Sequence, residues 1–124
     1  MHKSAIEIIS SKFGIYYAVL SSSLILTLDR SIQNYLGIKE LLNCGNLTEV
    51  FPELFGLEKE IHDVISRKRE RFSLNTVNRT VRSEIFFNLH VFSDPVNDDS
   101  GFVIVEDITE GSLSLRVVQQ KRNE

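Results

Sequence analysis

The chain has 124 residues, of which 42% are hydrophobic and 25% charged, an ordinary composition for one globular domain. Its formal net charge of −3 excludes a strong general attraction to nucleic acid or to an anionic membrane, so we expect neither as a direct partner. The single cysteine, Cys44, excludes an internal disulfide. Because the start of the chain lacks a signal-peptide pattern and no apolar run approaches the ~18 residues that span a bilayer, we expect a cytoplasmic protein or a soluble part of a larger one.

The first predicted elements are a helix and a hairpin. Residues 1–14 are expected to form an amphipathic leader helix, with Ser4 and Glu7 as a capping box and Gly14 as its stop. The β-branched and aromatic run IYYAVL and the alternating run LILTLD are expected to be strands, joined by a turn of three serines.

The middle of the chain predicts short helical turns and then one better helix. The stretches SIQNYLGI and IKELLNCG each end at a glycine, and residues 46–49 can start another turn before Pro52. The apolar residues Leu57, Ile61, Val64 and Ile65 then follow the spacing of an amphipathic helix. The basic cluster at residues 67–71 is expected at the C-terminal end of that helix, as a solvated end and not as a nucleic-acid patch.

Three strands close the predicted domain, at residues 71–79, 84–92 and 101–109. Two strands, a helical excursion and three more strands predict an α+β fold with an antiparallel sheet. Residues 111–124 are expected to begin an exit helix.

This order of elements, with the residues at its joints, resembles a PAS domain over residues 15–110. The similar stretches are YYAVLSSSLILTLDRSIQNYLG, VFPELFGLEKEIHDVI and VIVEDITEG, the last of which matches the Asp-Ile-Thr ending of the final PAS strand. The resemblance implies a five-stranded sheet of order 2-1-5-4-3 with helices on one face and a cavity between them. It also implies a sensor or dimerisation module of a bacterial signalling protein, such as a histidine kinase or nucleotide cyclase, with an effector domain beyond the exit helix.

Asp107, Ile108 and Thr109 are the expected signal relay between the sheet and the exit helix. Asp and Thr side chains can cap backbone groups where a strand ends, so these residues are suited to couple a distortion of the sheet to the following helix. The alternative is that they only terminate the strand.

His62 and Cys44 resemble ligand residues of particular PAS sensors. The string HDVISR is similar to that of haem-binding members, which would make His62 an iron ligand. A helical wheel, however, places His62 beside the apolar stripe and not along it, so we expect a surface histidine and no cofactor, and keep a haem-binding gas sensor as the alternative. Cys44 follows Asn43 as in flavin-binding members, but the surrounding pattern is absent and we expect a structural cysteine.

The strand at residues 84–92 is apolar on both faces, which predicts cover for the outer face of the sheet. We expect a parallel homodimer in which the leader helix packs on that face. The predicted interface residues are Ile6, Ile9, Phe13, Phe86 and Phe92, and the alternative is cover by the chain's own leader.

The interrupted segment VFPELFGLE is expected to bound a small cavity above the sheet, which side chains or a small-molecule ligand would fill. The predicted lining residues are Leu26, Phe51, Leu54, Phe55, Ile61, Ile65, Phe87 and Leu89. No glycine-rich phosphate loop, HExxH, CxxC or nucleophile elbow is present, so the third hypothesis, a small stand-alone enzyme, has no motif to support it.

Overall fold

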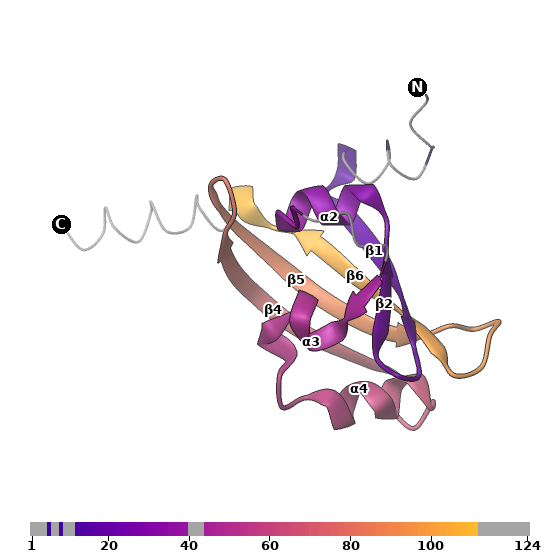
Figure 1. The fold of residues 1–124 in the computed structure, drawn as a ribbon. Coiled ribbons are helices and arrows are strands. Elements are labelled where there is room, and N and C mark those ends of the chain that lie inside the picture. Colours follow the sequence, from indigo (N-terminus) through magenta and orange to yellow (C-terminus); the bar gives the residue numbers. More distant parts are fainter. Residues whose placement is uncertain (1–4, 6–7, 9–11, 40–43, 112–124) are drawn as a thin grey trace.

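A computed structural model describes residues 5, 8, 12–39 and 44–111, and within them the chain folds around one antiparallel sheet (Figure 1). The six strands are β1 (Ile15–Ser21), β2 (Ile25–Leu28), β3 (Cys44–Asn46), β4 (Arg71–Thr80), β5 (Glu84–Ser93) and β6 (Ser100–Asp107). Their order across the sheet is β3-β2-β1-β6-β5-β4, and every pairing is antiparallel. The expected α+β class with an antiparallel sheet is confirmed.

The expected number of five strands is wrong, because β3 adds a sixth at the edge beside β2. Its residues Cys44, Gly45 and Asn46 pair with Thr27, Leu26 and Ile25. A segment of cysteine, glycine and asparagine has low strand propensity, and its place in the sheet comes from backbone pairing with a neighbour that is distant in sequence.

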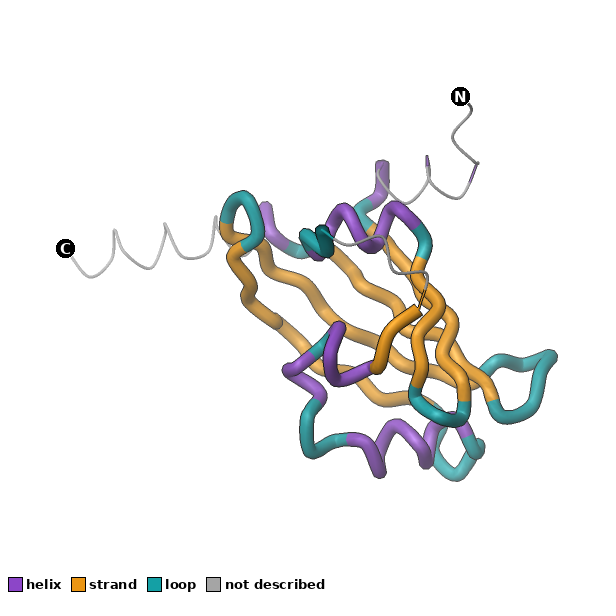
Figure 2. Tube along the Cα trace, viewed as in Figure 1, coloured by secondary structure: helices purple, strands orange, loops and turns teal. Residues whose placement is uncertain are grey.

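Short helices cover one face of the sheet (Figures 1 and 2). They are α2 (Arg30–Leu36), α3 (Leu47–Val50), the 3₁₀ turn η1 (Pro52–Leu54) and α4 (Glu58–Ile65). The Asp29 side chain caps α2 by accepting a hydrogen bond from the Ile32 amide at 3.0 Å. Gly37 ends the helix with a left-handed φ of 69°, as its position in the sequence predicts.

The helix α4 ends at Ile65, and the basic cluster lies in the turn that follows it. The Ser66 hydroxyl donates to the carbonyl of His62 at 2.8 Å, and Arg67 adopts a positive φ of 65°. The Lys68 amide then bonds the Asp63 carbonyl at 2.8 Å, which closes the turn. Residues 67–71 are exposed and directly follow the C-terminal end of α4, where the cluster was expected.

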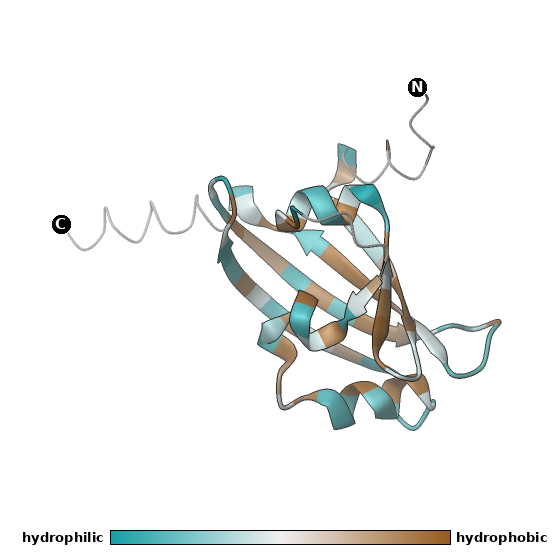
Figure 3. Cartoon of the chain, viewed as in Figure 1, coloured by the Kyte–Doolittle hydropathy of each residue, from teal (hydrophilic) through white to brown (hydrophobic). Residues whose placement is uncertain are grey.

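A single hydrophobic core lies between the helices and the sheet, and the apolar positions of the central strands are visible in Figure 3. The predicted stripe of α4 is confirmed, because Ile61, Val64 and Ile65 are all buried in this core. Alternate residues of β5 serve the same core, with Phe87, Leu89 and Val91 fully buried.

An irregularity in β4 changes which residues face the core. The pairing with β5 shifts between Leu74 and Val77, where Thr76 has a positive φ of 58° and its amide bonds the Asn88 side chain at 2.8 Å. Because of the bulge both Phe72 and Val77 are buried in the core, although residues five positions apart lie on opposite faces of a regular strand.

No helix among the described residues is long and apolar enough to cross a membrane. Most of the expected leader helix and the exit helix at 113–124 lie outside the described residues, as do Ile6 and Ile9.

Candidate functional site

Asp107 forms a hydrogen-bonded junction at the end of β6. Its backbone amide donates a hydrogen bond to the carbonyl of Gly14 at 2.7 Å, next to the start of β1. Its Oδ1 atom accepts hydrogen bonds from the Tyr35 hydroxyl at 2.8 Å and from the Thr109 amide at 3.1 Å. One carboxylate therefore ties the helix α2 to the segment that leaves the sheet.

Thr109 fastens the same segment to the start of β5. Its Oγ1 accepts a hydrogen bond from the Phe86 amide at 3.0 Å, and the Ile108 amide bonds the Phe86 carbonyl at 2.9 Å. The Thr109 hydroxyl is within hydrogen-bonding reach of both Asp107 Oδ1 and the Phe86 carbonyl, but its single proton can be donated to only one of them at a time. The hydroxyl thus has two alternative donor arrangements.

Two stacked tyrosines complete the surroundings of Asp107. The rings of Tyr16 and Tyr35 lie 4.5 Å apart at an interplanar angle of 23°, and Tyr35 also meets the edge of Phe87. Burial raises the pKa of Tyr35 strongly, and the hydrogen bond to the Asp107 carboxylate raises it further. Burial and the charge of Asp107 raise the pKa of Tyr16 in the same direction.

Two features of this junction favour glycine at position 14. Its φ is +67°, and a Cβ atom at this position would lie 3.2 Å from the Cβ of Asp107.

We use the name relay junction for Tyr35, Phe86, Asp107 and Thr109. An open hollow of about 300 Å³ borders it, with Lys12, Phe13, Gly111 and Glu110 among its lining residues.

The segment VFPELFGLE is fastened to the sheet by Arg79, a residue that the sequence did not single out. Its guanidinium donates to both carboxylate oxygens of Glu53, at 2.7 and 2.6 Å, and to the Val50 carbonyl at 2.8 Å. It also lies over the rings of Phe51 and Phe87, at 5.5 and 5.6 Å from their centroids. Burial opposes ionisation of Glu53, but the hydrogen bonds to Arg79 and to the backbone, together with the charge of Arg79, outweigh it, and the pKa of Glu53 is lowered.

Seven of the eight residues predicted to line a cavity are buried side chains of the core itself: Leu26, Phe51, Leu54, Ile61, Ile65, Phe87 and Leu89. The prediction is wrong for Phe55, whose side chain is 81% exposed. Phe55 follows the 3₁₀ turn with an extended backbone, and the chain turns again at Gly56, where φ is +88°. The side chain therefore leaves the core although its neighbour Leu54 is buried.

A separate apolar cavity of about 270 Å³ lies beside this segment. Its lining residues are Leu28, Ile38, Cys44, Gly45, Glu49, Val50, Pro52 and Arg79. None of the eight residues predicted from the sequence lines it.

His62 and Cys44 are both exposed. His62 lies on α4 next to the buried Ile61, outside the stripe that faces the core. Among the described residues no group of three or more His, Cys, Asp or Glu side chains is arranged to hold a metal ion.

The outer face of the sheet carries a polar network that the sequence analysis did not predict. His90 Nδ1 lies 2.8 Å from Ser73 Oγ, its cross-strand neighbour, and His90 Nε2 lies 3.3 Å from Glu106 Oε1. Asn88 donates to the same Glu106 oxygen at 3.0 Å. These hydrogen bonds from Asn88 and His90 lower the pKa of Glu106. Side chains at paired positions of adjacent strands contact one another in this way. Predicting the network therefore requires the strand register, which the sequence alone does not give.

Phe13, Phe86 and Phe92, the described members of the predicted dimer interface, differ in exposure. Phe13 is 65% exposed, while Phe92 is partly buried against Phe102 at 5.6 Å between ring centroids. Phe86 is only 6% exposed within the single chain.

Neither a scan against models of known protein families nor a search of curated proteins finds a match to this chain.

Proposed function

We propose that this chain is a non-catalytic sensor and dimerisation module of the PAS type, part of a bacterial cytoplasmic signal-transduction protein such as a histidine kinase. The proposal rests mainly on the relay junction, in which residues 107–109 are hydrogen-bonded to α2 and to β5 where the last strand ends. A displacement of either element changes the hydrogen bonds of the segment that leads out of the domain.

The sheet supports the same proposal. With the short edge strand β3 set aside, the order β2-β1-β6-β5-β4 is that of a five-stranded sheet numbered 2-1-5-4-3 along the chain. The short helices on one face and the single core between the layers suit a domain of this type.

The proposed mechanism is a change in ligand occupancy or subunit packing that alters α2 or β5 and switches the donor arrangement of Thr109. In one arrangement the hydroxyl binds Asp107, and in the other it binds the Phe86 carbonyl. The switch would alter the position of a following helix and, through that helix, the activity of an effector domain. Coupling between two sites typically changes an equilibrium by about 5- to 150-fold.

A chimeric kinase tests the relay. Residues 1–124 would replace the sensor domain of a histidine kinase of known activity, and autophosphorylation would be compared between wild type, Asp107→Asn and Thr109→Val. We expect each variant to shift the output by at least about fivefold. The matched control is Thr27→Val, an exposed threonine on β2. A folded chimera whose output is the same in all four proteins would contradict the proposal.

Dimerisation is tested separately by sedimentation of the whole chain. We expect a dimer that Phe13→Ser and Phe92→Ser weaken, whereas a monomer at high micromolar concentration would remove this part of the proposal. An absorption spectrum of freshly purified protein addresses haem, since a Soret band that His62→Ala abolishes would favour the gas-sensor alternative.

A further inference from the structure

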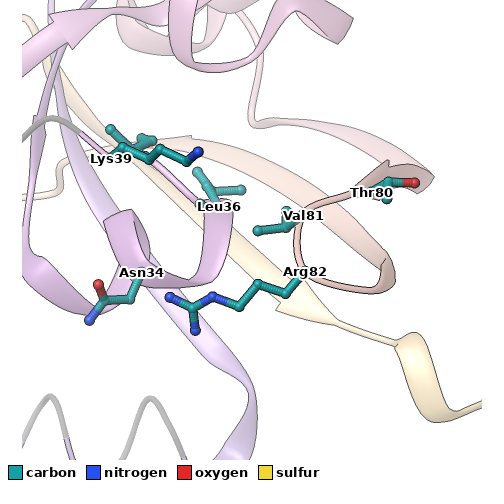
Figure 4. A pocket seen from close by; sticks show the side chains of 8 residues that line it. Asn34, Leu36, Lys39, Thr80, Val81 and Arg82 are labelled. Atoms are coloured by element: carbon teal, nitrogen blue, oxygen red, sulfur yellow. The ribbon is translucent and has the colours of Figure 1, made fainter.

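A positively lined cavity lies between the end of α2 and the β4–β5 turn (Figure 4). Its volume is about 560 Å³, and its lining residues are Asn34, Leu36, Gly37, Ile38, Lys39, Thr80, Val81 and Arg82. Two of these residues are cations and none is acidic, although the chain as a whole has a net charge of −3.

Lys39 and Arg82 lie on opposite sides of an apolar surface formed by Leu36 and Val81. Figure 4 shows Lys39 extending from the α2 side toward the turn and Arg82 extending from the turn back toward α2, with Leu36 and Val81 between them. Neither Lys39 nor Arg82 forms an ion pair with another described residue. The two sides of the cavity, at Lys39 and Arg82, therefore attract negative charge. The apolar surface between them favours apolar groups.

We propose that this cavity binds an organic carboxylate with a short apolar chain. The Arg82 guanidinium can bind a carboxylate through two parallel N–H···O bonds, and the apolar chain would lie on Leu36 and Val81. A phosphate group fits less well, because phosphates favour the free amides at helix N-termini and this cavity lies at the C-terminal end of α2.

The carbonyl end of α2 is a competing effect, since its partial negative charge repels an anion. Two of its last carbonyls are already bonded, those of Asn34 by the Gly37 amide at 3.2 Å and of Gln33 by the Ile38 amide at 2.9 Å. The helix is also only seven residues long. The full charges of Lys39 and Arg82 therefore outweigh the partial charge at the helix end.

The position of the cavity links it to the relay junction, and this step rests on the proposed function. Asn34 and Leu36 flank Tyr35, which holds Asp107. A carboxylate that draws Lys39 and Arg82 together would shift α2 relative to the β4–β5 turn and would change the hydrogen bond between Tyr35 and Asp107.

Titration of the ¹⁵N-labelled whole chain with octanoate, followed by amide chemical shifts, tests the site directly. We expect saturable shifts centred on Gly37, Ile38 and Val81. Octanamide has the same chain without the charge and should bind about fivefold more weakly, the upper end of what one exposed ion pair contributes. Raising the salt concentration should weaken octanoate and leave octanamide unchanged.

The double variant Lys39→Gln/Arg82→Gln should weaken octanoate at least about fivefold without changing octanamide. The matched control is Arg69→Gln/Arg71→Gln, which removes two cations from a different hollow lined by Arg69, Glu70, Arg71 and Phe92. Shifts centred on that hollow, equal binding of octanoate and octanamide, or the lack of saturable shifts in the millimolar range would each overturn the proposed site.

The relay step has its own readout. Octanoate should also shift the amides of Phe86 and Thr109 in the wild type, and Tyr35→Phe should abolish these distant shifts while octanoate still binds. Binding without the distant shifts would sustain the carboxylate site and overturn its coupling to the junction. An insensitive chimeric kinase would instead count against the proposed function and leave the binding result intact.

Discussion

Tyr35 donates its hydroxyl hydrogen to Asp107 across 2.8 Å, although 72 positions separate the two residues in the sequence. This bond joins the first helix on the sheet to the end of the last strand. Replacing Tyr35 by Phe removes the hydrogen bond and keeps the ring that stacks on Tyr16. We expect the free energy of unfolding to fall by about 1 kcal/mol in urea denaturation.

The control for this change is Tyr17→Phe, since Tyr17 has no side-chain hydrogen bond to another described residue. That variant should stay within about 0.5 kcal/mol of the wild type. Equal losses in both variants would mean that the bond to Asp107 contributes nothing specific.

Burial of Tyr35, together with the same bond, predicts a loss of stability at alkaline pH. The pKa of Tyr35 is raised in the folded chain, so the unfolded chain releases this proton first, near the ordinary tyrosine pKa of about 10. The contribution is therefore fully present below pH ~10 and is lost as the pH rises above it. Unfolding between pH 8 and 11 should show a steeper decline in the wild type than in Tyr35→Phe, and parallel curves would contradict the assignment.

Thr109→Val tests the other half of the relay junction. Valine keeps the branched shape but leaves the Phe86 amide without its acceptor, so we expect a loss of about 1–2 kcal/mol. Hydrogen exchange should accelerate at the Phe86 amide and stay unchanged at Val91, near the other end of β5. Thr27→Val serves again as the control, and unchanged exchange at Phe86 would show that Thr109 does not hold β5.

Glu53→Gln weakens the attachment of the VFPELFGLE segment. The Arg79 and Glu53 side chains are only 19% and 24% exposed, so we expect a loss of about 2 kcal/mol. Because the pKa of Glu53 is lowered in the fold, its contribution is present above the unfolded value near 4.5 and is lost as the pH falls below it. The variant should therefore lose less stability than the wild type on acidification.

The exposed pair of Arg67 and Asp98 provides the comparison for this test. Asp98→Asn should change the free energy of unfolding by less than about 0.5 kcal/mol. A similar effect of both substitutions would argue that burial of the Arg79–Glu53 pair is unimportant.

Gly37→Ala and Gly56→Ala separate backbone strain from side-chain contact. Both glycines have a positive φ, 69° and 88°, so alanine should cost about 1–2 kcal/mol at either position. A Cβ at Gly37 would also lie 2.4 Å from Val81 Cγ1, whereas nothing lies within 4 Å at Gly56. Gly37→Ala should therefore destabilise more, and Val81→Ala should restore part of the difference in thermal unfolding.

The sequence by itself determined the elements that depend on local patterns. Runs of β-branched and aromatic residues, alternation of apolar residues and turn signals predicted five of the strands, and the spacing of Ile61, Val64 and Ile65 predicted the buried side of α4. Gly37 marked the end of α2 because glycine readily adopts the left-handed conformation with which that helix ends. These features arise from interactions between residues that are close along the chain.

Only the tertiary structure decided the contacts that form across the sheet. Three contacts join segments that are distant in the sequence, so no local pattern predicts them. They are the pairing of β3, the hydrogen bond of Tyr35 to Asp107 and the ion pair of Arg79 and Glu53. The orientation of Phe55 was also decided at this level, because a 3₁₀ turn and Gly56 direct it away from the core that Leu54 enters. Hydrophobicity predicts that such residues tend to be buried, but the path of the backbone determines which of two neighbours reaches the core.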